Sequence, residues 1–153
     1  MRANLSKAYD ATVTVLNRLD ARDAGLKSDQ YLKTVLHGCM LDRTTTRSVQ
    51  ADGTASIGTV HRLQIPETAD YMPYREWSQT ETRGLFFTLR EGDYVIAGEV
   101  PEDVTAENVK KVVASYEPDA FQVQHFRDLT KRAGLFHSGR GPLRFAECYY
   151  VEG

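Results

Sequence analysis

The chain has 153 residues and a mass of 17.2 kDa, the size of one ordinary domain. Hydrophobic residues make up 41% and charged residues 26%, a balance that excludes a disordered or fibrous protein. The formal net charge of −2 argues against a protein that binds DNA by neutralising many phosphates. No apolar run reaches the roughly 18 residues of a membrane span, and the apolar stretch of a secretion signal is absent from Met1–Asp10.

Regular alternation of polar and apolar residues predicts most of the secondary structure. The β-branched stretch Ala11–Leu16 has the pattern of a half-buried strand. A turn signal at Asp52-Gly53 lies between two β-prone stretches, so we expect a long hairpin over Arg43–Ile65 with a polar tip that projects from the body. Similar patterns predict strands at residues 31–37, 85–89, 94–97, 120–126 and 143–151.

One helix is expected, over residues 104–116. Asp103 or Thr105 is suited to cap its N-terminus. An apolar stripe follows at helical spacing and predicts one face turned toward a core: Val109, Val112, Val113 and Tyr116. The sum is a mainly β protein, a small β-barrel or compact sandwich of about six to seven strands with one short α-helix, forming a single domain over residues 1–153.

Charge is distributed unevenly along the chain. Residues 1–66 carry nine basic and six acidic side chains, residues 67–119 carry five and twelve, and residues 120–153 carry five and three. The net charges of +3, −7 and +2 sum to −2. An acidic middle favours complementary contact with copies of the chain or with a partner, although an acidic loop and helix facing solvent is the simpler alternative.

Histidine and cysteine are the residue types that invite an enzymatic interpretation. The four histidines are isolated and show no metal-binding spacing, and Cys39 and Cys148 belong to no CxxC pair. We therefore predict no catalytic residue, no metal ligand and no cofactor. A small enzyme with a convergent His/Cys or His/carboxylate site, such as one built on His37 and Cys39, is the alternative of another class. A disulfide between the cysteines stays open, since the second and last strands could be neighbours.

Two groups of side chains are candidates for contacts with other molecules. Tyr71, Tyr74 and Trp77 lie in an irregular segment, where such aromatic residues either cover the core or anchor a protein interface. Arg132, Arg140 and Arg144 lie in or beside a glycine-containing loop and are candidates to contact DNA or an acidic neighbour, the alternative being a solvated turn.

The order of these segments resembles a known family. The motifs TVTVLNR, YLKTVLHGC, VHRLQIP, FFTLREGDYVIAGEV and DAFQVQHFRDL follow one another between Ala11 and Gly153. In this order they are similar to the head-completion proteins of tailed bacteriophages, also described as stopper, connector or minor capsid proteins. The stretch Thr105–Tyr116 and the C-terminal hairpin have no clear counterpart in that family.

The resemblance implies a structural virion protein and no enzyme. It implies a homo-oligomeric ring in the phage neck, assembled in the host cytoplasm, between the portal or adaptor and the tail terminator or tube. DNA would pass through the ring without specific contact, and no membrane would be involved. The projecting loop, which would contact neighbours or the channel, contains Arg47, Gln50, Asp52, Gly53 and Thr54. A tail-terminator, tail-completion or capsid-decorating protein is the alternative within the same class.

Overall fold

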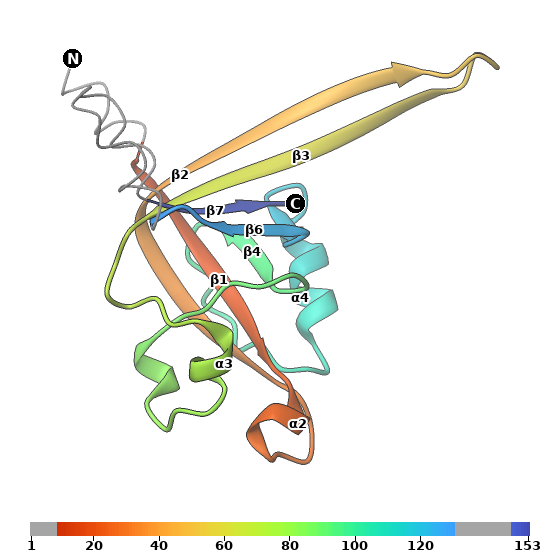
Figure 1. The fold of residues 1–153 in the computed structure, drawn as a ribbon. Helices are drawn as coiled ribbons and strands as arrows, with labels where there is room; N and C mark the ends of the chain where they lie inside the picture. The colour runs from red at the N-terminus through yellow and green to blue at the C-terminus, as the bar shows by residue number, and fades with distance from the viewer. Residues whose placement is uncertain (1–8, 131–147) are drawn as a thin grey trace, which may run out of the picture.

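The computed structural model describes residues 9–130 and 148–153, and it is mainly β (Figure 1). Seven antiparallel strands form one sheet in the order β5-β4-β1-β2-β3-β7-β6, and the sheet curls into a half-barrel, as the sequence predicts. The strands are β1 (Ala11–Leu19), β2 (Gln30–Val49), β3 (Ala55–Pro66), β4 (Tyr94–Ala97), β5 (Ala120–Gln122), β6 (His125–Asp128) and β7 (Cys148–Glu152).

Two consecutive strands, β5 and β6, lie at the opposite edges of this sheet. The sequence predicts one continuous strand over residues 120–126, and that prediction is wrong, because the chain changes partner after Gln122. The Val123 N–H donates to the Asp93 carbonyl at 2.7 Å, beside β4, whereas the Gln124 N–H donates to the Glu152 carbonyl of β7 at 2.9 Å. The curl of the sheet brings its two edges close enough for a two-residue link to join them.

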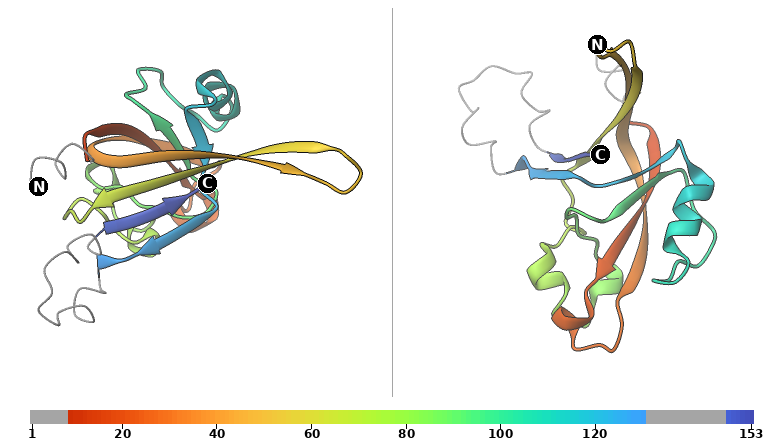
Figure 2. Two further views of the ribbon diagram at one scale, coloured as in Figure 1. Left: turned by 90° about the horizontal axis from the view of Figure 1, so that it is seen from above. Right: turned by 90° about the vertical axis from the view of Figure 1, so that its right-hand side faces the viewer.

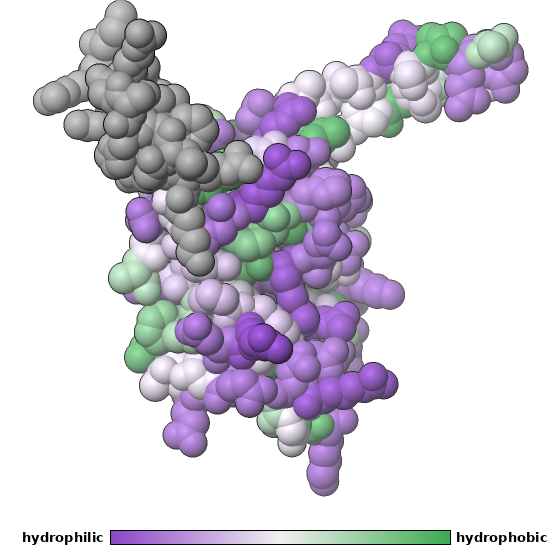
Figure 3. All heavy atoms as spheres, viewed as in Figure 1, coloured by the Kyte–Doolittle hydropathy of each residue, from purple (hydrophilic) through white to green (hydrophobic). Residues whose placement is uncertain are grey.

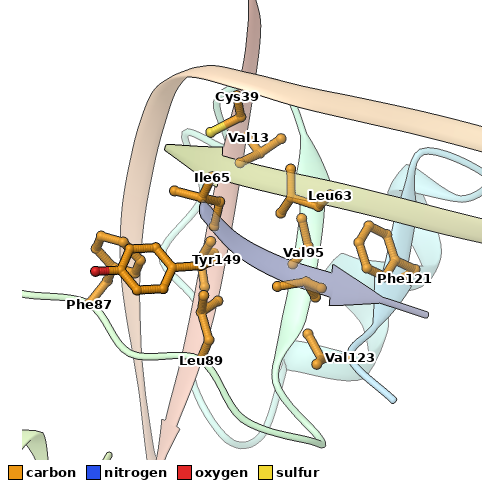
Figure 4. Packing of buried hydrophobic residues seen from close by; sticks show 12 residues of the cluster. Val13, Cys39, Leu63, Ile65, Phe87, Leu89, Val95, Phe121, Val123 and Tyr149 are labelled. Carbon is orange, nitrogen blue, oxygen red and sulfur yellow. The ribbon is translucent and has the colours of Figure 1, made fainter. Parts of the chain in front are cut away.

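The main core fills the inside of the curl (Figure 4). Side chains from β1, β3, β4, β7 and the β5–β6 segment meet there, and most of them are less than 5% exposed. Alternate residues of each strand point inward, as the period of two requires. The cluster is made of Val13, Val15, Cys39, Leu63, Ile65, Phe87, Leu89, Val95, Phe121, Val123, Tyr149 and Val151.

Helix α4 (Val109–Tyr116) covers the outer face of β1 and β4 and creates a second core. Val109 and Val113 pack there with Leu16 and Ile96. The sequence predicts a half-buried β1, but both of its faces are buried from Val13 to Asn17 because the helix lies on its outer side.

The start of α4 is later than predicted. The chain first makes a turn in which the Thr105 N–H donates to the Asn108 side chain at 2.7 Å, and the Asn108 N–H donates back to the Thr105 hydroxyl at 3.3 Å. Thr105 therefore stabilises the turn before the helix, and regular helix begins at Val109 instead of residue 104.

Leu85–Leu89 is not a strand of the sheet, contrary to the sequence prediction. Part of it forms the short helix η1 (Arg83–Leu85), and Phe87 makes an isolated bridge to Tyr71. The four-residue helices α2 (Ala21–Ala24) and α3 (Tyr74–Trp77), which the sequence pattern does not reveal, lie at the same end of the molecule (Figures 1 and 2).

Strand β2 is longer than predicted, because it continues through Gly38 instead of ending there. Gly38 has φ of +70°, a conformation open mainly to glycine, and the pairing of β1 with β2 shifts register at this level. Up to Cys39 the strand pairs with β1, and from Met40 it pairs with β3. Gly38 therefore lies where β2 passes from pairing with β1 to pairing with β3.

The two cysteines are both buried and no disulfide joins them. Cys39 lies on β2 and Cys148 on β7, with β3 between these strands in the sheet. The second and last strands are therefore not neighbours, which removes the reason for expecting a disulfide.

Candidate functional site

The most prominent feature outside the body is the arm, defined here as the part of the β2–β3 hairpin from Asp42 to Arg62. Its strands pair without interruption from Asp42 opposite Arg62 to Val49 opposite Ala55, so eight residue pairs extend it by roughly 25 Å. Every side chain from Asp42 to Thr59 is exposed, and Figure 2 shows the arm standing clear of the described body. The expected projecting hairpin is present, and it is longer than a connection between strands requires.

The tip of the arm is a tight, hydrogen-bonded turn. The Gln50 N–H donates to the Thr54 carbonyl at 2.8 Å, and the Gly53 N–H donates to the Gln50 carbonyl at 2.9 Å. Gly53 has φ of +86°, which explains the glycine. The Asp52 carboxylate accepts the Thr54 N–H at 2.9 Å, and hydrogen bonds from Thr54 lower the pKa of that carboxyl. These residues hold the shape of the tip.

The two faces of the arm differ in chemistry. Residues opposite one another in the ladder share a face, so Arg47 with Ile57 and Val49 with Ala55 lie on the face that continues the buried side of β3. Ile57 is 71% exposed and Val49 67% exposed. On the other face the outer positions are small and polar: Thr44, Thr46, Ser48, Ser56 and Gly58.

The base of the arm is fixed to the body. The His61 ring stacks on Phe121 with ring centroids 4.7 Å apart, and its Nε2 lies 3.0 Å from the Pro118 carbonyl oxygen. Arg43 forms an ion pair with Asp119 at 3.5 Å. Because these contacts join the arm to the segment that follows α4, the arm leaves the body in a defined direction.

The aromatic residues predicted either to cover the core or to anchor an interface are placed differently from one another. Trp77 is fully buried, and its Nε1–H donates to the carbonyls of Arg83 and Phe86, each at 3.2 Å. Tyr71 packs on Tyr149 with centroids 4.2 Å apart, and burial raises the pKa of Tyr71 to about 12. Both side chains therefore help to cover the core, which is one of the two predicted alternatives.

Tyr74 is half-buried beside them and takes part in a polar contact. The Arg90 guanidinium lies 3.5 Å from its ring centroid, which is a cation–π arrangement. Its hydroxyl donates to the Asp23 carboxylate at 2.6 Å and accepts the Asp20 N–H at 3.2 Å. Tyr74 therefore ties helix α2 to the segment Arg90–Asp93, and the three predicted aromatic residues do not form one exposed patch.

Next to Tyr74 and Arg90 lies a pair of buried polar side chains, Asn17 and Asp93. The sequence analysis does not predict this pair. The Asn17 side chain donates to the Thr88 carbonyl and accepts the Thr88 N–H at 3.2 Å. It also donates to Asp93 at 2.9 Å. The Asn17 side chain thus makes the two backbone hydrogen bonds of Thr88 that a neighbouring strand would otherwise make. This explains how Leu85–Leu89 can lie outside the sheet. The available signal was an asparagine within an otherwise apolar strand.

The predicted arginine contacts cannot be placed, since Arg132, Arg140 and Arg144 lie outside the described residues. Among the residues that are described, no three metal-binding side chains come together. No helix in that same part of the chain is long and apolar enough to cross a membrane.

The His37–Cys39 pair does not have the geometry expected of neighbouring residues on one strand face. The two sequence positions predict a shared face, but His37 is exposed and Cys39 is fully buried, since Gly38 between them is left-handed. The His37 Nδ1 lies 3.0 Å from the Thr12 hydroxyl. Burial raises the pKa of the Cys39 thiol to about 11, whereas a nucleophilic cysteine requires a lowered one.

Comparison with known proteins gives one match. Neither the curated proteins nor the solved structures contain a similar chain at the level required for a match. Residues 8–138 match the model of a protein family that is described as a family of unknown function, DUF6751. Because this match covers most of the sequence, from before β1 to beyond β6, the chain belongs to the DUF6751 family.

Proposed function

We propose that this protein is a structural protein that assembles with copies of itself through its arm. The observation that carries the proposal is the arm itself, with eight residue pairs and full exposure from Asp42 to Thr59. A two-stranded ribbon without a packed face is marginally stable in water. Its unpaired strand edges and its exposed Ile57 and Val49 are suited to contact another protein chain.

The assembly we propose is a ring of the head-to-tail connector in a tailed bacteriophage. The resemblance of the segment order to head-completion proteins supports this choice, as does the small β-barrel-like body with one projecting hairpin. In that place the ring would surround the DNA channel between portal or adaptor and tail. Net negative charge in residues 67–119 suits a surface that DNA passes without binding, or one that meets a basic neighbour.

Deletion of residues 47–57, with the paired residues Thr46 and Gly58 rejoined by a short turn, tests the role of the arm. We expect the wild-type chain to form an oligomer of defined size in size-exclusion chromatography with light scattering, and a ring in electron micrographs. The shortened chain should be a folded monomer with a free energy of unfolding within about 0.5 kcal/mol of wild type, since the deleted residues are all exposed and pack on no core. If the deletion abolishes soluble expression, the hairpin belongs to the core and the proposal is wrong.

Binding to phage particles distinguishes the connector from its alternatives. With DNA-filled heads that lack their neck proteins, a connector should bind at the portal vertex. Binding over the whole shell indicates a capsid-decorating protein, and binding at the end of the tail tube indicates a tail terminator. A wild-type chain that stays monomeric and turns over a small substrate would instead establish the enzymatic alternative.

A further inference from the structure

We propose that the outer end of the arm of one copy docks in a hollow at the opposite end of the next copy. This inference rests on the proposed self-assembly and names the surfaces that carry it. The inserted part is the Arg47–Ile57 pair with its neighbour Val49, and the receiving part is a hollow beside the start of β2.

The inserted surface combines apolar area with one positive charge. Ile57 and Val49 are among the few large hydrophobic side chains that are strongly exposed in the described structure. Figure 3 shows apolar residues set among hydrophilic ones along the arm. Arg47 lies directly opposite Ile57, and no described residue forms a hydrogen bond or an ion pair with it. A partner for this surface must therefore offer both an apolar contact and a negative charge.

The receiving hollow offers both. It has a volume of about 500 Å³ and lies between the start of β2 and the loop before α4. Tyr31, Val104 and Ala106 supply its apolar wall, and the carboxylates of Asp29 and Glu107 supply negative charge. Asp29 is already 3.6 Å from the Arg18 guanidinium, whereas Glu107 has no ion pair within the described ranges. Glu107 is thus the carboxylate open to a new cation.

Charge also excludes the simplest alternative, in which two arms pack against each other. Arg43 and Arg47 lie four positions apart on β2, an even number, and so share the apolar face. Face-to-face packing of two arms would bring these like charges together at an apolar contact, which costs free energy. An acidic hollow removes that repulsion, so the body of a second copy is the better partner for the arm.

The positions of the two surfaces determine the kind of assembly. The arm leaves one end of the body, while the start of β2 and helix α2 lie at the other end (Figures 1 and 2). The arm therefore points away from its own hollow. Contact between different surfaces of successive copies is heterologous, and such contact forms a closed ring when the rotation between copies closes.

Charge reversal tests this contact. Arg47→Glu and Glu107→Arg should each raise the dissociation constant of self-association by about tenfold or more, because each places like charges together. The double variant should recover most of the wild-type affinity. Ser48→Glu, on the polar face of the arm, and Glu117→Arg, just after α4, are the matched controls and should leave self-association unchanged. Sedimentation equilibrium over a range of concentrations measures the wild type and the five variants.

Cysteine cross-linking provides a second measurement. Both native cysteines are buried, so an Ile57→Cys, Ala106→Cys chain should form disulfides between copies under mild oxidation, in a ladder of covalent oligomers. Each single cysteine variant should give no ladder beyond a dimer.

The outcomes separate this inference from the proposed function. If the wild type assembles and the two charge reversals assemble equally well, or if Ser48→Glu weakens assembly as much as Arg47→Glu, the docking is wrong while self-assembly stands. If the wild type remains a monomer at its highest soluble concentration, both the docking and the proposed function are wrong. Rescue in the double variant together with the cross-linked ladder supports the docking.

Discussion

At the scale of single residues, the buried side chains of Asn17 and Asp93 join the paired strands β1 and β4 to the segment around Thr88 and Arg90, which belongs to no strand. Asn17 satisfies both backbone groups of Thr88, a residue with no exposed surface. Asp93 accepts the N–H groups of Arg18 at 3.0 Å and Arg90 at 3.2 Å. Buried backbone groups without partners cost free energy, so this pair is what permits an unpaired segment to pack on β1.

Replacement of Asn17 by leucine, which is close in size, tests this role. We expect a loss of about 1–3 kcal/mol of unfolding free energy for each Thr88 backbone group left without a partner. Urea unfolding measures the difference, and Gln124→Leu at an exposed position is the control, with an expected change within about 0.5 kcal/mol. Equal effects of the two substitutions would show that the amide has no special role.

The buried carboxyl of Asp93 should make the stability of the protein depend on pH. Burial raises the pKa of this carboxyl from 3.8 to about 6, although the N–H groups of Arg18 and Asn17 oppose the shift. Between about pH 4 and 6 the native state therefore binds more protons than the unfolded chain, and the contribution of Asp93 to stability falls as the pH rises. Across that window the unfolding free energy of the wild type should fall by about 3 kcal/mol relative to Asp93→Asn, which does not titrate.

Urea unfolding of both chains at several pH values between 3.5 and 7 provides the measurement. A wild-type advantage that grows with pH would contradict the raised pKa of Asp93, because it would mean that the charged carboxylate is the form favoured by folding.

At the scale of elements, the sequence pattern predicts that α4 and the hairpin exist, but it does not predict where the helix begins or how long the hairpin is. The spacing of Val109, Val112, Val113 and Tyr116 predicts the apolar face of the helix, and these residues do pack on β1 and β4. Spacing did not predict where the helix begins, since the Thr105–Asn108 turn competes with the first helical turn. The hairpin was predictable from Asp52-Gly53, but its length depends on how far β2 continues beyond Gly38.

Substitutions in α4 measure how much its buried face contributes to the free energy of unfolding. Val113 is 6% exposed in the second core, so Val113→Asp should lower the unfolding free energy by about 3 kcal/mol or more. Ala114, the next residue, is exposed, and Ala114→Asp should have an effect below about 1 kcal/mol. Urea unfolding distinguishes them, and similar losses in both variants would mean that the helix is not packed on the sheet as described.

At the scale of the whole molecule, the curled sheet divides the protein into a rigid body and an arm. Strand β1 pairs on both sides and is buried on both faces, whereas the arm has an exposed surface on both faces. The body therefore supplies the stability, and the arm, together with the hollow at the opposite end, is available for contact with other copies.

Hydrogen exchange followed by mass spectrometry should resolve this division. Amides of β1 should exchange most slowly, near the rate of global unfolding, and amides of the arm should exchange fastest in dilute monomer. When the protein is concentrated enough to assemble, protection should increase in the arm and around Glu107 and leave β1 unchanged. Strong protection of arm amides in the dilute monomer would contradict the description of the arm as exposed.

What the sequence determined by itself is local: which stretches alternate, where Asp52-Gly53 turns, and which face of α4 is apolar. These features depend on neighbouring residues alone, and together they indicated a mainly β protein with one projecting hairpin and one helix. The tertiary structure decided the rest, because it depends on residues far apart in the chain. It divides residues 120–128 between two sheet edges, lets Asn17 replace a strand for Thr88, and places the arm at the opposite end of the molecule from the start of β2.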